Sequence, residues 1–393
     1  MADNKQNKRP NVPPLRFPEF AGEWERTKLG NHITIYSGSS PNLIVEENGE
    51  IPYYKVEQLN WCDKYLSDTP YLSKRNKLTL PPNCIVFSKR GAAILTNKVR
   101  INPFAINIDT NLMGISVNDS SSLDCNFLYY FILKAELGKI ADTSTIPQIN
   151  NIHINPLIIP IPSIGEQRKV AKFISLLDHR IAVQSKLIEQ LESLIKGITL
   201  QASKSSDCES VLLSDILTER NEVNTAQHEV CSVSVSQGVV NQVEYLGRSF
   251  AAKDISHYNV VHYGDIIYTK SPTGDFPYGI VKRSHQKNLV AVSPLYGVYI
   301  PASNDIGCFL HYYFCNAVSA KNYLHKLIQK GAKNTINITN QRFLENTINL
   351  PKAEKLAQVV TLLNCLTAKK QQAENLLILL NKQKQFFLNQ MFI

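Results

Sequence analysis

The chain carries the same pattern of residues twice, and this internal repeat limits the folds open to it. In each half, a segment rich in aromatic and strand-forming residues ends in an apolar strand with prolines, and a long helix follows. The first copy runs from about Trp24 to Ser203 and the second from about Val211 to Phe392. The following segments correspond in the same order: Ile85–Lys89 with Ile266–Lys270, Leu112–Gly114 with Leu295–Gly297, Phe127–Phe131 with Phe309–Phe314, and Leu176–Asp178 with Leu362–Asn364. Their shared order indicates a duplicated unit with small insertions and deletions.

The length of the chain also favours two domains. At 393 residues it exceeds what one hydrophobic core usually organises. Within each copy, short β-like runs broken by turn residues precede a short helix, which predicts an α+β class. The predicted divisions are an N-terminal tail (1–20), a first α/β domain (21–162), a central helix (163–203), a second α/β domain (204–350) and a C-terminal helix (351–393).

The central helix has a clear start and a regular apolar stripe. Ser163 and Glu166 have the Ser-x-x-Glu spacing of a capping box, in which the two side chains satisfy free main-chain N–H groups at the helix start. The apolar residues that follow fall on a heptad, which predicts that this helix pairs with another. The predicted pairing residues of this helix are Ile174, Leu177, Ile181, Ile188, Leu191 and Ile195.

The second copy supplies a partner helix after Pro351, a residue suited to the first turn of a helix. The sequence predicts a seam for this helix that is interrupted by polar residues, and its predicted pairing residues are Leu362, Leu366, Leu376 and Leu380. An antiparallel coiled coil of the two helices requires the intervening domain to fold back. The alternative is that each helix packs on its own domain as an ordinary amphipathic helix.

Charge and cysteine content limit which kinds of partner and which cellular compartment are expected. The net charge of +9 favours a polyanionic partner, although a basic protein with no nucleic-acid role is also compatible with it. The 8 cysteines are far apart and form no CxxC pair, so we expect free thiols in a reducing cytoplasm. The N-terminus has no apolar signal segment, and no apolar run is long enough to span a bilayer. These features predict a cytoplasmic protein without a membrane partner.

Basic residues lie at corresponding places in the two copies, near predicted turns. Lys and Arg with Asn, Ser, Thr and Tyr between them can neutralise phosphates and place hydrogen-bonding groups at base edges. For any single residue, a solvated charged surface explains the pattern equally well. The predicted DNA-binding residues are Lys89, Arg90, Lys98 and Arg100 in the first copy, and Lys270, Lys282, Arg283, Lys330, Lys333 and Asn334 in the second.

Motifs for catalysis are missing. The sequence has no phosphate-binding Gly-x-x-x-x-Gly-Lys loop, no Gly-x-Ser-x-Gly elbow and no His-Glu-x-x-His pair. The nine histidines are scattered singly, so no metal site is predicted. Carboxylates such as Asp109 and Asp265 follow turns without the partners of a nuclease site. We therefore predict no catalytic residues and no cofactor in this chain.

Several motifs resemble the specificity (S) subunit of type I restriction-modification systems. They are Leu15–Phe20, Glu23–Glu25, Gly49–Tyr53, the junction from Ile161-Pro162 to Glu166-Gln167, and Leu177–Ile181. The resemblance covers nearly the whole chain. The second copy departs from it, because the segment after Pro351 has no Glu-Gln pair and Asn364 stands in the place of Asp178.

The resemblance implies a fold and a function. Such subunits carry two target-recognition domains separated by two long helices in an antiparallel coiled coil, and each domain reads one half of an asymmetric, interrupted DNA site. They perform no chemistry. Two methyltransferase (M) subunits, which bind S-adenosylmethionine and flip out an adenine for N6 methylation, dock on the helices, and restriction (R) subunits add ATP- and Mg2+-dependent cleavage.

Other functions stay open on the sequence alone. One is a specificity subunit of another restriction class, in which the methyltransferase is fused to the nuclease. A second is a coiled-coil scaffold that does not read DNA, and a third is a stand-alone methyltransferase or nuclease. The sequence does not give the DNA target or show whether a restriction subunit is present.

Overall fold

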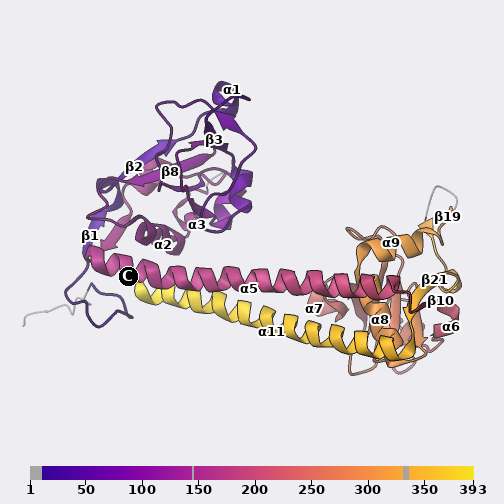
Figure 1. Cartoon of the computed structure of the whole chain (residues 1–393). Helices are drawn as coiled ribbons and strands as arrows, with labels where there is room; N and C mark the ends of the chain where they lie inside the picture. The colour runs from indigo at the N-terminus through magenta and orange to yellow at the C-terminus, as the bar shows by residue number, and fades with distance from the viewer. Residues whose placement is uncertain (1–10, 144–145, 331–335) are drawn as a thin grey trace, which may run out of the picture. The chain divides into compact units, whose positions relative to one another are not determined.

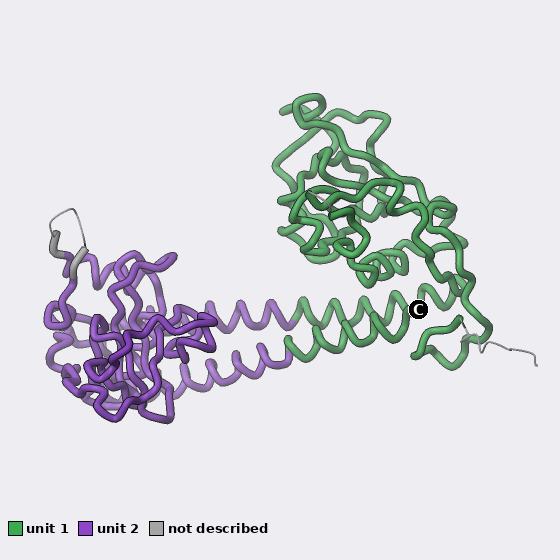
Figure 2. The backbone as a smooth tube through the Cα atoms, turned by 180° about the vertical axis from the view of Figure 1, so that it is seen from behind, with its two compact units in different colours: residues 1–183, 377–393 green, residues 184–376 purple. Residues whose placement is uncertain are grey.

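The computed structural model describes residues 11–143, 146–330 and 336–393, which fall into two compact units (Figure 2). Unit 1 comprises residues 1–183 and 377–393, and unit 2 comprises residues 184–376. Each unit therefore contains one globular domain together with a part of each long helix.

In unit 1, the domain is built around an antiparallel sheet with the strand order β2-β8-β5-β6. A smaller sheet has the order β4-β3-β7, and β1 pairs with β9 where the domain meets the long helix. The strands are β1 (Glu25–Lys28), β2 (Ile33–Ser37), β3 (Ile51–Tyr54), β4 (Leu72–Ser73), β5 (Ile85–Ser88), β6 (Val99–Ile101), β7 (Asn107–Ile108), β8 (Leu112–Val117) and β9 (Ile158–Ile161). The short α-helices are α1 (Pro41–Ile44), α2 (Cys125–Ala135), α3 (Leu137–Ile140) and α4 (Asn151–Ile154), and the 3-10 turns are Leu29–Asn31, Val56–Asn60 and Ala92–Thr96.

In unit 2, the main sheet has the order β11-β18-β15-β16, and the pairs β12-β13, β14-β17, β10-β21 and β19-β20 surround it. The strands are β10 (Cys208–Leu212), β11 (Leu217–Glu219), β12 (Cys231–Ser234), β13 (Gly238–Asn241), β14 (Asn259–Val261), β15 (Ile266–Thr269), β16 (Ile280–Arg283), β17 (Val290–Val292), β18 (Gly297–Pro301), β19 (Gln329–Lys330), β20 (Ile336–Asn337) and β21 (Thr347–Pro351). The short helices are α6 (Leu213–Ile216), α7 (Gln242–Leu246), α8 (Asn304–Cys315), α9 (Ala317–His325) and α10 (Asn340–Phe343).

The two sheets confirm the internal repeat. In both main sheets the third strand, β5 or β15, is fully buried and pairs antiparallel with both of its neighbours. Ile85 pairs with Ile115 and Ile101, and Ile266 pairs with Tyr299 and Arg283 at the same places. The helices α2 and α8 begin alike, because a capping side chain accepts a main-chain hydrogen bond at each start. The α+β class predicted from the sequence is confirmed.

Two long helices complete the fold: α5 (Ile164–Lys204) and α11 (Ala353–Met391), labelled in Figure 1. The first turns of α5 pack on the core of unit 1 through Val170 and Ile174. The first turns of α11 pack on the core of unit 2 through Leu356 and Leu363. Each helix therefore begins as part of its own domain, as the alternative interpretation proposed, before it pairs with the other helix.

The pairing is antiparallel in both units. In unit 1, the Phe173 and Phe387 rings lie 4.8 Å apart between centroids, and Lys384 forms a 2.6 Å ion pair with Asp178. In unit 2, the Gln184 side chain of α5 donates a 3.0 Å hydrogen bond to the Ala373 carbonyl of α11, and Glu192 forms a 2.8 Å ion pair with Lys370. In each unit, the partner's residue number falls on α11 as it rises on α5. The predicted antiparallel pairing of the two helices is therefore confirmed.

Candidate nucleic-acid interface and helix pair

The predicted basic residues of unit 1 lie together around the connection from β5 to β6. Lys89 follows β5 and is half-buried, and burial lowers the pKa of its ammonium group, as does the neighbouring Arg90. Arg90 is exposed. Lys98 contacts the Asn60 side chain, and Arg100 donates a 2.7 Å hydrogen bond to the Leu59 carbonyl. Arg90 is thus the most available cation of this group, while Arg100 holds the loop in place.

The predicted basic residues at β15 and β16 of unit 2 are less accessible. Burial lowers the pKa of Lys270, which follows β15. Lys282 and Arg283 are only 5% and 3% exposed. Lys282 Nζ lies 3.1 Å from Cys315 Sγ on α8, and Arg283 donates a 2.7 Å hydrogen bond to Asn304.

The burial of this pair has a physical reason and changes the expected surface. Strand β16 is covered by α8, and Arg283 takes the place that Ile101, a core residue, has in the first copy. Because both side chains are engaged inside unit 2, contact with DNA from Lys282 or Arg283 would require these interactions to open. Their predicted role as surface cations is corrected accordingly.

The last predicted group follows α9. Lys330 belongs to β19, but its side chain is outside the described part of the structure. Lys333 and Asn334 lie outside the described residues altogether. All three stay predictions. Exposed cations that the sequence reasoning did not select include Arg248, Lys253 and Lys287, which lie in loops of unit 2.

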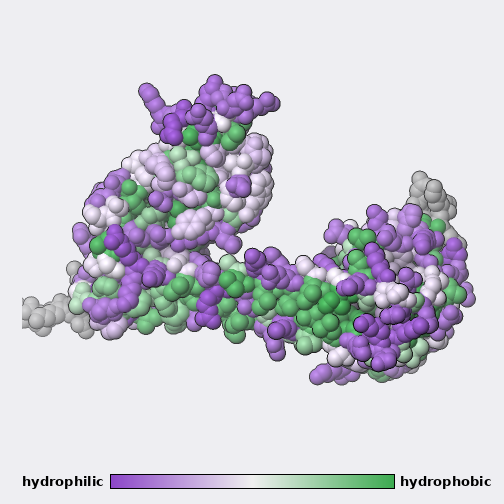
Figure 3. Space-filling model, viewed as in Figure 1, coloured by the Kyte–Doolittle hydropathy of each residue, from purple (hydrophilic) through white to green (hydrophobic). Residues whose placement is uncertain are grey.

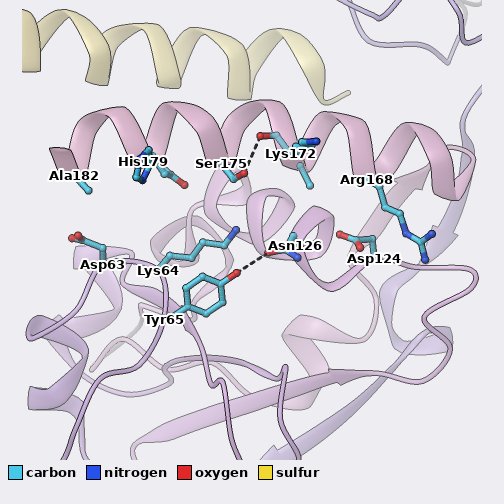
Figure 4. A pocket seen from close by; sticks show the side chains of 12 residues that line it. Asp63, Lys64, Tyr65, Asp124, Asn126, Arg168, Lys172, Ser175, His179 and Ala182 are labelled. Atoms are coloured by element: carbon cyan, nitrogen blue, oxygen red, sulfur yellow. Dashed lines mark hydrogen bonds between the residues drawn. The ribbon is translucent and has the colours of Figure 1, made fainter. Parts of the chain in front are cut away.

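A cavity of about 670 Å³ lies in unit 1 between the domain and α5 (Figure 4). Arg168, Lys172 and His179 line it from α5, and Lys64 and Tyr65 line it from the domain. The sequence reasoning did not select this place. The signal that could have found it is the Leu177–Ile181 motif, whose Asp178 and His179 line the cavity.

The Glu-Gln pair at the start of α5 joins three segments of unit 1. Arg16 forms two 2.7 Å hydrogen bonds with the buried Glu166 carboxylate, and the Trp24 indole N–H lies 3.3 Å from it. Gln167 accepts a 2.8 Å hydrogen bond from the main-chain N–H of Asp124, the capping residue of α2. This pair therefore fixes the N-terminal segment and α2 to the long helix.

The capping box predicted at this place forms only in part. The Ser163 hydroxyl accepts a 3.4 Å hydrogen bond from the Glu166 N–H, as predicted. The Glu166 side chain instead binds Arg16, because a guanidinium offers the buried carboxylate two charge-assisted hydrogen bonds.

The seam of α5 agrees with the predicted residues. Ile174, Leu177 and Leu191 are buried, and Ile181, Ile188 and Ile195 are half-buried. Their alternating spacing of three and four residues continues along the helix, which is the pattern of a coiled-coil seam.

The seam of α11 requires a correction of register. Leu380 is buried and Leu366 is half-buried, as predicted, but Leu362 and Leu376 are 47% and 41% exposed. The seam uses the following residue at these two places. Its members are Leu356, Val359, Leu363, Leu366, Lys370, Ala373, Leu377, Leu380, Lys384, Phe387 and Met391. Lys370 and Lys384 are accommodated because Glu192 and Asp178 of α5 neutralise them.

Outside the seam, the long helices expose apolar side chains (Figure 3). In unit 1 these include Leu176 and Val183 of α5 and Leu379 and Phe386 of α11. In unit 2 they are Leu187, Leu194 and Leu200 of α5, and Leu362 and Leu376 of α11. Within each unit these side chains recur mostly at intervals of seven residues, so each part of the helix pair carries an apolar stripe outside the seam.

Two further findings concern the described residues. Within residues 11–143, 146–330 and 336–393, no group of three or more His, Cys, Asp or Glu side chains is placed to hold a metal ion. In the same part of the chain, no helix combines the length and the apolar character that crossing a bilayer would require.

The fold thus defines a class of protein with two homologous α+β domains and a shared antiparallel helix pair. Residues 21–193 match the family of the type I restriction modification DNA specificity domain. The MjaVIII specificity subunit of a Methanocaldococcus jannaschii type I restriction enzyme is 25% identical over 191 residues, which are 47% of this chain and 42% of that protein. The aligned part therefore spans less than half of that relative.

Solved structures share the same fold. The type I restriction-modification S subunit from M. genitalium has a TM-score of 0.58 at 14% identity, over 97% of this chain and 99% of that chain. A chain from a structural study of complex assembly and conformational transition in the type I R-M system has a TM-score of 0.55 at 12% identity, over 94% and 97%. The chain is therefore similar to type I restriction-modification specificity subunits over residues 21–193, somewhat less than half of its length, and it shares the fold of the solved S subunit along nearly its whole length.

Proposed function

We propose that this chain reads DNA sequence for a type I restriction-modification complex. In this proposal, the domains at residues 21–162 and 204–350 each recognise one half of an asymmetric, interrupted site. The observation that carries it is the duplicated main sheet with unequal exposed cations around it: Arg90 follows β5 in the first copy, whereas Arg248 and Lys253 lie in loops of the second. Two similar readers with different side chains suit a bipartite site whose halves differ.

The proposal also covers assembly. Two methyltransferase (M) subunits, which use S-adenosylmethionine for adenine-N6 methylation, dock on the helix pair, and restriction (R) subunits that use ATP and Mg2+ join them. The exposed apolar stripe supports this, because a contiguous apolar surface bordered by polar residues favours a protein partner. Methylation and cleavage therefore belong to the partner subunits, and this chain supplies binding and orientation.

Selection from random DNA duplexes tests the reading function. The purified complex of this chain with its methyltransferase subunits is used to enrich bound duplexes, which are then sequenced. We expect two short specific elements separated by a gap of fixed length and free sequence. A single continuous element, or no enrichment over unselected DNA, would contradict the proposal.

Co-purification tests the assembly function. Leu379→Asp places a charge in the exposed stripe, and we expect it to lower recovery of the methyltransferase subunit at least about tenfold, since it buries a charge at the interface. Gln385→Asp, at an exposed position of the same helix outside the stripe, is the matched control. Equal recovery with both variants would contradict docking on this stripe. If the complex of Leu379→Asp with the methyltransferase subunits still selected DNA, another docking surface would be favoured.

A further inference from the structure

In unit 1, one carboxylate joins three elements. The Tyr130 hydroxyl of α2 donates a 2.7 Å hydrogen bond to Asp178 Oδ2 on α5. The other oxygen, Asp178 Oδ1, forms the ion pair with Lys384 of α11. Tyr130 is fully buried, and burial and the negative charge of Asp178 both raise the pKa of its hydroxyl. The domain is therefore tied to both long helices at this carboxylate.

Lys64 adds a second cation to this network from a loop of the domain. Its Nζ lies 3.4 Å from the Tyr130 hydroxyl and within 5.1 Å of the Tyr129 and Tyr130 ring centroids. Figure 4 shows its side chain directed toward α5. Burial lowers the pKa of Lys64, and the Asp178 carboxylate opposes this shift. The Tyr130 hydroxyl therefore lies between a cation of the domain, Lys64, and a carboxylate of α5, Asp178.

Unit 2 contains the equivalent contact without the charges. The Tyr312 hydroxyl of α8 donates a 3.0 Å hydrogen bond to Asn364 Oδ1 and lies 2.9 Å from the Thr367 hydroxyl, both on α11. Tyr312 and Tyr130 follow the same Phe-Leu-x sequence on their helices. Asn364 and Asp178 each follow a buried leucine of the seam, Leu363 or Leu177. The duplication has therefore preserved the contact while its acceptor changed from carboxylate to amide.

We propose that Tyr130 with Asp178 and Tyr312 with Asn364 are paired anchors that set the orientation of each recognition domain on the helix pair, and thereby the gap length at which both half-sites are read. This inference rests on the proposed DNA-reading function. The four residues are positioning residues and do not contact DNA.

The physical reason lies in the kind of contact. Apolar packing between a domain and a helix is not directional, so it permits small rotations at little cost. A hydrogen bond weakens steeply when its angle departs from linearity, and these hydroxyls are held on the rigid helices α2 and α8. A small rotation of a domain about such an anchor displaces a distant base-reading surface along the DNA axis.

The test measures preference for gap length. Duplexes carry the two selected half-sites at the preferred gap, or at gaps one base pair shorter or longer, and binding by the complex with methyltransferase subunits is compared. We expect Tyr130→Phe and Tyr312→Phe to reduce discrimination between gaps about three- to tenfold, while the preferred half-site sequences stay the same. Tyr129→Phe and Tyr313→Phe, at the adjacent tyrosines, are the matched controls and should leave gap discrimination unchanged.

Two acceptor variants separate positioning from stability. Asp178→Asn retains an acceptor oxygen, as the second copy does, and should preserve gap discrimination, whereas Asp178→Ala should lose it as Tyr130→Phe does. A general loss of stability would lower binding at all gaps alike. Discrimination within twofold of wild type in both tyrosine variants overturns the inference alone. If the wild-type complex showed no bipartite specificity, both the proposed function and this inference would be overturned.

Discussion

The side-chain amide of Gln184 on α5 donates a 3.0 Å hydrogen bond to the main-chain carbonyl of Ala373 on α11. Gln184 occupies a seam position of α5 between Ile181 and Ile188, and every other predicted pairing residue of this helix is apolar. A single polar residue in a seam specifies register at a cost in stability, because shifted registers leave its amide without a partner. In this register the bond gives the Gln184 amide an acceptor on the other helix.

The first prediction follows from this bond. Gln184→Leu should raise the free energy of unfolding by about 0.5–1.5 kcal/mol, since an apolar side chain replaces a partly buried amide. It should also loosen the register. A zero-length amine–carboxylate crosslink between Lys370 and Glu192, which lie 2.8 Å apart, reports the native register by mass spectrometry.

We expect this crosslink to decrease in Gln184→Leu and crosslinks displaced along the helix to increase. Gln190→Leu, at an exposed position of α5, is the control and should change neither quantity. A lower midpoint of unfolding in Gln184→Leu with an unchanged crosslink pattern would show that the amide stabilises the pair without selecting its register.

The second prediction concerns the ion pair at the start of α5. Arg16→Ala leaves the Glu166 carboxylate, whose side chain is 1% exposed, without its charge partner. Breaking a buried pair from one side typically costs about 3–5 kcal/mol. The double variant Arg16→Ala/Glu166→Gln should recover part of this loss, because the buried group is then neutral. Chemical denaturation of the three proteins measures both effects.

An exposed ion pair of the same unit provides the control. Lys169 and Glu19 have side chains that are 46% and 45% exposed, so Glu19→Gln should change the unfolding free energy by less than about 1 kcal/mol. If Arg16→Ala cost no more than Glu19→Gln, the Glu166 contact would have no special role in attaching the N-terminal segment.

The third prediction separates surface cations from buried ones. Arg90 is exposed, so Arg90→Ala should weaken DNA binding and reduce the slope of log affinity against log salt by about 1. Lys282→Met removes a cation that is 5% exposed, so it should leave the slope unchanged. Titrations of selected DNA at several salt concentrations compare the two. An unchanged slope in Arg90→Ala would remove Arg90 from the interface.

The sequence predicts the fold best where both faces of an element are buried. Strands such as β5 and β15 are buried on both faces, so both copies retain runs of apolar residues and the repeat stays visible. The seam of α5 was also readable, because its three-four spacing is unbroken from Ile174 onward. In both cases the pattern depends on local periodicity alone.

The seam of α11 could not be placed from periodicity. Adjacent leucines, such as Leu362 with Leu363 and Leu376 with Leu377, fit two neighbouring registers equally well. Packing decides between them: Leu363 is fully buried while Leu362 is 47% exposed. Lys370 in the seam becomes understandable only through Glu192 on the other helix, a partner that the local sequence does not reveal.

The candidate interface shows the same limit. The pair Lys282-Arg283 has the composition of a DNA-binding turn, but it lies on a strand covered by α8. Likewise, the Glu166 side chain was expected to cap its own helix, whereas Arg16 binds it from a segment far away in the sequence. Long-range contacts, rather than residue types, decide which polar groups face solvent.

The last prediction concerns acid stability of unit 2. Burial lowers the pKa of His311 to about 3, and the positive charges of Lys282 and Arg283 act in the same direction. His285 lies at the exposed edge of this cluster. Partial burial lowers its pKa to about 4, and His311 and Arg283 act in the same direction. His311 is neutral in the folded protein at neutral pH, and its Nδ1 accepts a 3.3 Å hydrogen bond from the Arg283 N–H.

An unfolded histidine has a pKa of about 6.5. As the pH falls below that value, the unfolded chain binds a proton at this histidine and the folded chain does not, so the unfolded state is favoured until the pH approaches the folded pKa. His311 should therefore contribute stability above about pH 6.5 that is lost on acidification, by about 1.4 kcal/mol per pH unit.

His311→Asn retains an acceptor for the Arg283 N–H but does not titrate. Its unfolding free energy should fall less steeply between pH 6 and pH 4 than that of wild type. His179→Asn, at an exposed position on α5, should follow the wild-type curve. Parallel curves for His311→Asn and wild type would show that this histidine is protonated in the folded chain as readily as in the unfolded one.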